Sequence, residues 1–222
     1  MTWLIVFDWD GTLYDSFPTK RKLAGEVLHK HLGISQAEAE EHYRQTVGSP
    51  MLKIIQKIFT KTKGQPPTKE QAQEILQDYY GQLTERLAKC RLFRDSKPAL
   101  EKLKANGHKI ALLTAAHKEH YDKVLQAENI DQLFDAKVTL EDDSDKSQAI
   151  AKLIQEMHTD NKHTVLVGDS TTDIAQGKKA GVHTVGRIGT FLSADLRAAG
   201  AENLLSDLER LPFVVQSFDA RA

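Results

Sequence analysis

"WLIVFDWDGTLYDS", residues 3–16, begins like a buried strand and ends like a polar loop. Its apolar run leads directly into two aspartates, Asp8 and Asp10, with Trp9 between them. Two carboxylates placed together at the end of a buried strand repel each other, which costs electrostatic energy. We therefore expect a cation or a basic side chain beside them. Trp9 itself is expected to pack against the core rather than to touch a substrate.

Other short apolar runs predict further strands, because continuous runs of this length are typical of strands buried on both faces of a parallel sheet. With "WLIVF" (3–7), these runs are "KIALLT" (109–114), "AKVT" (136–139), "TVLVG" (164–168) and "VHTVG" (182–186). From about residue 91 onward they alternate with helical patterns, as in "DSKPALEKLKANG" (95–107). This alternation predicts an α/β fold with a Rossmann-like, doubly wound parallel sheet.

Residues 17–90 have a different pattern, with no convincing strand. Ser35 and Thr68 are expected to be helix N-caps, and Gln71 completes a capping box with Thr68. We predict about four helices here. They form a helical cap domain (17–90) inserted after the first strand of a catalytic core (1–16 and 91–222).

Composition narrows the class of protein. The 222 residues carry a net charge of −1, are 40% hydrophobic and 27% charged, and include one cysteine, Cys90. The charge favours neither a nucleic acid polymer nor a membrane surface as a partner, and no stretch approaches the roughly 20 apolar residues of a membrane span. The N-terminal apolar run is too short for a signal peptide and lacks a basic lead. We expect a cytoplasmic protein, either a monomer or a homodimer.

Polar residues gather at the predicted carboxyl ends of the strands, where open α/β sheets bind ligands. Any one of them alone would more often be a helix N-cap or a solvated loop charge, but their convergence predicts a functional site. Carboxylate oxygens at this density suit Mg²⁺. The residues are Asp8, Asp10, Thr114, Lys146, Asp169 and Asp173.

An EF-hand calcium loop starting at Asp8 is excluded by its spacing. Leu13 stands at the sixth position, which requires glycine, and Thr19 at the twelfth, which requires glutamate.

Three of these stretches resemble the motifs of the haloacid dehalogenase-like hydrolase superfamily. "DWDGTLYDS" (8–16) resembles the first motif, "LLTAA" (112–116) the second and "VGDSTTDIAQGKKAGV" (167–182) the fourth. The resemblance covers nearly the whole chain, is strongest for the phosphoglycolate phosphatase-like and β-phosphoglucomutase-like subgroups, and implies a helical cap. Members are mostly Mg²⁺-dependent phosphatases and phosphotransferases that work through a phospho-aspartate.

The resemblance implies a role for each polar residue in turnover. Asp8 would be the nucleophile. Asp10 would protonate the leaving oxygen and then activate water. Thr114 and neighbouring backbone N–H groups, including that of Ala115, would hold phosphoryl oxygens, and Lys146 would neutralise charge on the phosphoryl group and on Asp8.

The same resemblance implies the metal ligands. Mg²⁺ would be held by carboxylates of Asp8 and Asp169 and by the backbone carbonyl of Asp10. Asp173 would act through a water molecule or by orienting Lys146.

Two departures from the family pattern stand out. The third motif is usually Lys-Pro, but here it is "DKSQ" (145–148), so Lys146 is assigned by its position in a loop after the third strand. Lys137, predicted in a strand, and Lys152, predicted on a helix, are poorer candidates. Ala115 stands where the family often has asparagine, which removes one polar contact.

Weaker signals remain outside this constellation. "TVGSP" (46–50) resembles the inter-helix loop with which such caps contact substrate, so Arg44, Gly48 and Ser49 are candidate substrate residues. A metal site at His117 and His120, or a second cation site at "EDDSD" (141–145), is disfavoured relative to solvated surface.

The sequence thus predicts a phosphoric monoester hydrolase that acts on a small phosphorylated metabolite: a phosphoglycolate-like compound, a sugar phosphate or a nucleotide. A phosphomutase of the β-phosphoglucomutase type stays open as an alternative, and so does a catalytically silent binding protein of the same fold. A receiver-like signalling module is disfavoured, because such modules are far shorter and have no inserted helices.

Overall fold

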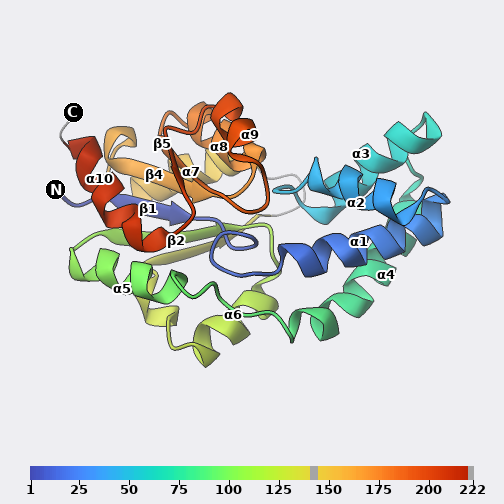
Figure 1. Cartoon of the computed structure of the whole chain (residues 1–222), viewed down its shortest axis with the longest axis horizontal. Coiled ribbons are helices and arrows are strands. Elements are labelled where there is room, and N and C mark those ends of the chain that lie inside the picture. The colour runs from blue at the N-terminus through green and yellow to red at the C-terminus, as the bar shows by residue number, and fades with distance from the viewer. Residues whose placement is uncertain (141–144, 220–222) are drawn as a thin grey trace. The chain divides into compact units, whose positions relative to one another are not determined.

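The computed structural model describes residues 1–140 and 145–219. The chain divides into two compact units (Figure 1). The sheet unit consists of Met1–Asp15 and Leu92–Ala222, and the helical unit of Ser16–Arg91. Each unit has its own buried apolar core. Whether the helical unit works as a cap stays a prediction.

The sheet unit is built on a six-stranded sheet in the order β3-β2-β1-β4-β5-β6. All neighbouring strands are parallel, and the order reverses at β1, whose two neighbours are β2 and β4. The predicted Rossmann-like α/β fold is confirmed. The strands are β1 (Leu4–Phe7), β2 (Lys109–Thr114), β3 (Ala136–Thr139), β4 (Thr164–Gly168), β5 (His183–Arg187) and β6 (Asn203–Leu205).

The strand predictions are confirmed for β2, β3 and β4 at the bounds expected, while β1 begins one residue later and β5 is shifted by one residue. Strand β6 was not predicted from the sequence. This strand has three residues, pairs with β5 alone and begins with the polar Asn203, so it presents no apolar run that would reveal it.

Helices cover both faces of this sheet, with α5 and α6 on one side and α7 and α8 on the other (Figure 1). Side chains from β1, β2 and β4 form one core cluster with α7, including Val6, Leu113, Ile150 and Leu166. The helices are α5 (Ser96–Ala105), α6 (Lys118–Ala127), α7 (Lys146–Glu156), α8 (Thr171–Lys179), α9 (Ser193–Ala199) and α10 (Leu211–Asp219), with the 3₁₀ turns η1 (Asp131–Leu133), η2 (Asn161–His163) and η3 (Leu208–Arg210).

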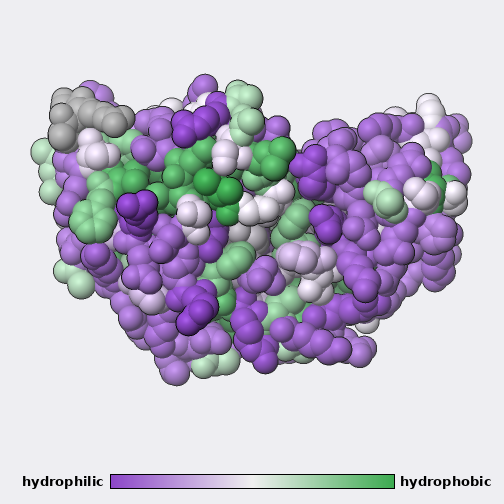
Figure 2. Space-filling view, in the orientation of Figure 1, coloured by the Kyte–Doolittle hydropathy of each residue, from purple (hydrophilic) through white to green (hydrophobic). Residues whose placement is uncertain are grey.

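The helical unit consists of α1 (Phe17–Leu32), α2 (Gln36–Arg44), α3 (Met51–Lys63) and α4 (Lys69–Leu87). All of its residues are described and none lies in a strand, so the helical prediction is confirmed. Ser35 accepts a hydrogen bond from the Glu38 N–H as the N-cap of α2. Thr68 and Gln71 form the predicted capping box of α4. The face of this unit visible in Figure 2 is mostly hydrophilic.

Among the residues that the structure describes, none of the helices combines the length and the apolar character that a membrane crossing requires.

Candidate active site

The loop after β1 turns back sharply on itself and fixes where Asp8 lies. The Asp8 N–H donates to Val167 of β4, which extends the sheet ladder, and the Trp9 carbonyl accepts from the Leu13 N–H at 2.9 Å. Gly11 has φ +81°, a conformation that favours glycine, and a Cβ there would overlap the carboxylate of Asp169. Glycine thus lets the loop backbone approach Asp169 closely.

Trp9 faces into the protein. It is 1% exposed and stacks on Tyr14 with ring centroids 5.2 Å apart. The prediction that Trp9 packs against the core is confirmed.

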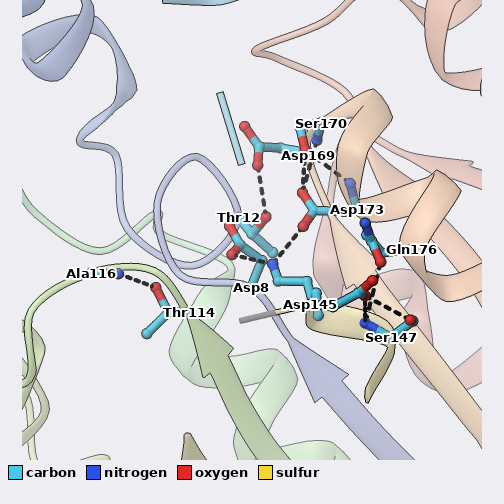
Figure 3. Close-up of polar contacts among 11 residues, drawn as sticks. Asp8, Thr12, Thr114, Ala116, Asp145, Ser147, Asp169, Ser170, Asp173 and Gln176 are labelled. Carbon is cyan, nitrogen blue, oxygen red and sulfur yellow. Dashed lines mark hydrogen bonds and ion pairs between the residues drawn. The ribbon is translucent and has the colours of Figure 1, made fainter. Parts of the chain in front are cut away.

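A cluster of buried carboxylates lies at the carboxyl edge of the sheet, where the strand order reverses (Figure 3). Asp8, Asp169 and Asp173 each offer an oxygen, and these oxygens lie within 4.8 Å of one another. All three residues are buried. Such a set of hard oxygen donors is suited to a divalent cation.

Lys146 joins this cluster from α7. Its ammonium donates to Asp8 Oδ1 at 2.8 Å and to Asp173 Oδ1 at 2.5 Å, and the residue is 3% exposed. The expectation that Lys146 lies in a loop is wrong. It is the first residue of α7, because Asp145 caps that helix by accepting from the Ser147 N–H.

The two alternative lysines lie where the sequence placed them. Lys137 is in β3 and forms an ion pair with Asp131, and Lys152 is exposed on α7. Neither has an interaction with a carboxylate of the acidic cluster in the described part of the chain.

Asp173 has two structural tasks, one for each oxygen. Its Oδ2 accepts from the Ser170 hydroxyl at 2.6 Å, while its own N–H donates to Ser170 Oγ, so the two residues form the capping box of α8. Its Oδ1 accepts from Lys146. The helix start therefore holds the carboxylate that orients the lysine.

Asp169 has one oxygen that is satisfied and one that is not. Oδ1 accepts from the Thr12 hydroxyl at 3.2 Å. Oδ2 is buried and has no hydrogen-bond partner among the described residues. An orphaned buried carboxylate oxygen is costly, and a bound cation would satisfy it. The donor set therefore fits a hard divalent metal ion.

Burial and the neighbouring charges shift the pKa values of the clustered side chains. Burial raises the pKa of Asp8 to about 7, Lys146 opposes the rise and Asp173 adds to it. Burial also raises the pKa of Asp169 well above its usual range, and the charges of Asp8 and Asp173 add to the effect. Burial alone would lower the pKa of Lys146, but the carboxylates of Asp173 and Asp8 outweigh it, so the net shift is upward.

The remaining predicted residues of the sheet unit lie around this cluster. Asp10 is half-buried, and its charge contributes to the raised pKa of Asp8. Its carboxylate is not part of the cluster. Thr114 ends β2, is 1% exposed and accepts from the Ala116 N–H at 3.0 Å, and half-buried Ala115 follows it.

The weaker candidates lie elsewhere in the chain. Arg44 ends α2 and is held by Glu41 at 2.7 Å, and Gly48 and Ser49 lie in the loop before α3. All three belong to the helical unit. His117 and His120 contact each other through their rings, 6.0 Å apart. The acidic stretch 141–145 lies outside the described residues except for Asp145.

Sequence reasoning missed Thr12 and Ser170 as residues that hold the cluster together. Ser170 carried a usable signal, since a serine three residues before an acidic residue at a helix start is a capping-box pattern. Thr12 carried none, because only the turn of the loop shows that its hydroxyl reaches Asp169.

The fold and the site together define a class: a doubly wound α/β protein with a buried acidic centre, suited to a metal ion, at its topological switch point. The sequence model of the haloacid dehalogenase-like hydrolase family matches residues 5–187. The chain belongs to this family. The predicted resemblance and the predicted enzyme class, a phosphatase-type hydrolase, are confirmed.

Individual relatives agree with this assignment. The chain is 29% identical over 186 residues to a protein provisionally named pyrophosphatase PpaX from Caldanaerobacter subterraneus subsp. tengcongensis, covering 82% of this chain and 79% of that one. It is 28% identical over 188 residues to phosphoglycolate phosphatase of Aquifex aeolicus, covering 82% of each. A solved hydrolase from Pseudomonas syringae has the same fold, with a TM-score of 0.84 at 20% identity over 97% of this chain and 99% of that one.

Proposed function

We propose that the chain is a Mg²⁺-dependent phosphatase that hydrolyses a small phosphorylated metabolite through an aspartyl phosphate on Asp8. The observation that carries the proposal is the buried cluster of Asp8, Asp169 and Asp173 with Lys146 bonded to two of its members. Names of relatives, phosphoglycolate phosphatase among them, support the substrate class.

The metal ligands follow from the donor set. Asp8, Asp169 and the backbone carbonyl of Asp10 would hold Mg²⁺, which when bound supplies positive charge to the phosphoryl group and to the carboxylates. The orphaned Oδ2 of Asp169 is the atom that most requires such a partner.

The first half-reaction transfers the phosphoryl group to the enzyme. A carboxylate oxygen of Asp8 attacks phosphorus, the bond from phosphorus to the leaving oxygen breaks, and Asp10 donates a proton to that oxygen. The Thr114 hydroxyl accepts from the Ala116 N–H, which leaves its own hydrogen for a phosphoryl oxygen. Lys146 stabilises the negative charge between Asp8 and the phosphoryl group.

The second half-reaction releases phosphate. Asp10 takes a proton from water, the water oxygen attacks phosphorus, and the bond from phosphorus to Asp8 breaks. Inorganic phosphate leaves, and Asp8 returns to its starting state.

We assign the choice of substrate to the helical unit, in which Arg44, Gly48 and Ser49 are candidate contact residues. This unit holds more lysine and arginine than aspartate and glutamate, which favours an anionic substrate.

Phosphate release from a panel of compounds tests the proposal. The panel contains 2-phosphoglycolate, inorganic pyrophosphate, sugar phosphates and nucleoside monophosphates, each with Mg²⁺ and with EDTA. We expect Mg²⁺-dependent release concentrated on one compound, and none from Asp8→Asn, which keeps the side-chain shape but lacks the nucleophile. Turnover by Asp8→Asn near the wild-type rate would overturn the nucleophile assignment. Phosphoryl transfer between sugar positions, dependent on a sugar bisphosphate, would favour the phosphomutase instead.

A further inference from the structure

The helical unit contains a hollow between the end of α2 and the middle of α3. Its volume is about 180 Å³. The hollow is built entirely from residues of this unit, so it involves none of the carboxylates of the acidic cluster. Its lining residues are His42, Gln45, Thr46, Lys57, Ile58 and Lys61.

The lining of the hollow includes two lysines and no acidic residue. Lys57 and Lys61 lie one turn apart on α3, where like charges repel each other. Within residues 1–140 and 145–219, neither lysine forms an ion pair with a carboxylate. The Lys61 ammonium instead donates to Nδ1 of His42 at 3.3 Å. An ammonium whose one bonded partner among the described residues is a histidine ring still lacks a counterion.

Two carboxylates of α2, the helix that supplies His42, already have partners. Glu41 accepts from Arg44 at 2.7 Å and from the Gln45 side chain at 2.8 Å. The Arg44 hydrogen bonds lower the pKa of Glu41 to about 2. Glu38 lies 3.6 Å from Nε2 of His42, on the ring edge opposite to the atom that Lys61 contacts. Neither Glu38 nor Glu41 forms an ion pair with Lys57 or Lys61.

Two other lining residues, Thr46 and Ile58, are buried. The buried Thr46 hydroxyl donates to the His42 and Tyr43 carbonyls at the end of α2, 3.0 Å from each. Ile58 is 1% exposed and gives the hollow an apolar wall. Side chains that are already packed in the free protein lose little further entropy when a ligand binds.

We propose that this hollow binds a small dianion, a metabolite that carries a phosphate or two carboxylates, through Lys57 and Lys61. Its volume lies below the roughly 300–1,000 Å³ of pockets for drug-sized ligands, so it suits one anionic group with a few carbon atoms. None of the lining residues belongs to the acidic cluster, and the proposal does not depend on the reaction proposed for that cluster.

Titration of the ¹⁵N-labelled whole chain with inorganic phosphate, followed by NMR in EDTA, tests the site. The amides of residues 42–46 and 57–61 should shift and saturate. The double variant Lys57→Gln, Lys61→Gln should weaken binding at least tenfold, and Lys57→Arg, Lys61→Arg should retain it. Malonate, titrated in parallel, distinguishes a site for dicarboxylates from one restricted to phosphate.

The matched control is Lys69→Gln, which removes the same charge from an exposed position on α4. This variant should bind phosphate like the wild type. Linear shifts without saturation, equal shifts from potassium chloride at the same ionic strength, or equal weakening by Lys69→Gln would each overturn the proposal. Any of these results would mean that the lysines attract anions non-specifically and do not form a binding site.

Discussion

Lys146 donates to Asp8 and to Asp173 while it is almost fully buried, so it is the sole ammonium bonded to both carboxylates in the described structure. Without it, two carboxylates would face each other in a medium that screens charge poorly. Its position at the start of α7 explains how a chain without the Lys-Pro motif still delivers a lysine here. The helix N-cap Asp145, rather than a proline, fixes the backbone before it.

Replacing Lys146 tests its assignment as the lysine of the third motif, which was made from its position in the sequence alone. Lys146→Ala should lower kcat by about 10²–10³, the loss typical of one electrostatic stabiliser. It should also lower the free energy of unfolding. Breaking a buried ion pair typically costs about 3–5 kcal/mol. We expect a smaller loss here, because Asp8 with a pKa of about 7 can take up a proton. Steady-state kinetics and urea unfolding measure the two effects.

Lys152→Ala is the control, since Lys152 is an exposed residue of the same helix. It should leave both quantities unchanged. If activity fell with Lys152→Ala and survived Lys146→Ala, the third motif would be misplaced.

Thr12 allows a finer test of the metal site, because its hydroxyl bonds Oδ1 of Asp169, whereas Oδ2 has no hydrogen-bond partner among the described residues. Thr12→Val removes this bond but keeps the shape, so Mg²⁺ affinity should fall about 10-fold, as for other residues that orient a ligand. Thr12→Ser keeps the hydroxyl and should bind Mg²⁺ like the wild type. Calorimetric Mg²⁺ titration without substrate gives the comparison. Equal affinities for Thr12→Val and the wild type would show that Thr12 does not orient Asp169.

Lys146 could be predicted as a site residue from the sequence, whereas Thr12 could not. Asp8, Asp169 and Lys146 could be placed together because each follows a strand that an apolar run reveals. Thr12 could not, since its contact depends on the left-handed turn at Gly11 rather than on periodicity. The roles of Asp8, Asp169 and Lys146 in turnover stay predictions.

At the scale of elements, α8 packs unusually close to the sheet that carries the site. A Cβ on Gly177 would lie 2.6 Å from the Thr184 side chain of β5 and 3.3 Å from that of Leu166 in β4. Glycine therefore sets the distance between helix and sheet. By contrast, Gly81 in α4 has open space around it.

This pair of helical glycines gives opposite expectations for the same substitution. Gly177→Ala should destabilise the protein by about 1–3 kcal/mol, because the added methyl group overpacks the interface. Gly81→Ala should stabilise by roughly 0.5–1 kcal/mol, because alanine restricts the unfolded chain and clashes with nothing. Urea unfolding followed by far-UV circular dichroism measures both. A stabilising Gly177→Ala would mean that α8 can move away from the sheet without cost.

The first strands depend on His108, which precedes β2. Its Nδ1 accepts from the Trp3 N–H at 3.3 Å, and burial, aided by the charged N-terminus and opposed by Asp219, lowers the pKa of His108 below its usual 6.5. As the pH falls, the unfolded chain therefore binds the proton first. Stability is present above pH 6.5 and is lost as the pH falls through the lowered value.

His108→Gln should remove that part of the pH dependence, since the glutamine oxygen can still accept from Trp3 but does not titrate. Free energies of unfolding at pH 7.5 and pH 5, compared between the two proteins, test this. An unchanged pH dependence would show that His108 does not cause the loss of stability.

Helices and strands, like site residues, could be predicted where neighbouring residues determine them and not where distant contacts do. Strands of four to six residues, such as β2 and β3, are visible in the sequence because burial on both faces demands apolar runs. The edge strand β6 is not visible, because its three residues are defined by pairing with β5 alone. Helix ends were predictable where side chains cap them, as at Ser35 and Thr68.

For the molecule as a whole, the division into two units allows the sheet unit to be followed by its own spectroscopic signal. The carboxylates of the acidic cluster belong to the sheet unit, as do both tryptophans of the chain, Trp3 and Trp9. Both rings are buried in that unit. Tryptophan fluorescence therefore reports on the unit that would hold the metal, whereas helical circular dichroism reports on both units.

Mg²⁺ should therefore raise the midpoint of thermal unfolding seen by tryptophan fluorescence. A ligand that binds only the folded state at 100 times its Kd stabilises it by about 2.7 kcal/mol, which corresponds to roughly 5–10 °C for a unit of this size. Asp169→Asn removes the carboxylate whose Oδ2 has no partner among the described residues, so its midpoint should not respond to Mg²⁺. Potassium chloride at equal ionic strength controls for screening. A wild-type midpoint that ignores Mg²⁺ while the protein stays folded would remove the metal from the proposal, because a cation that contacts these buried carboxylates must stabilise the fold that brings them together.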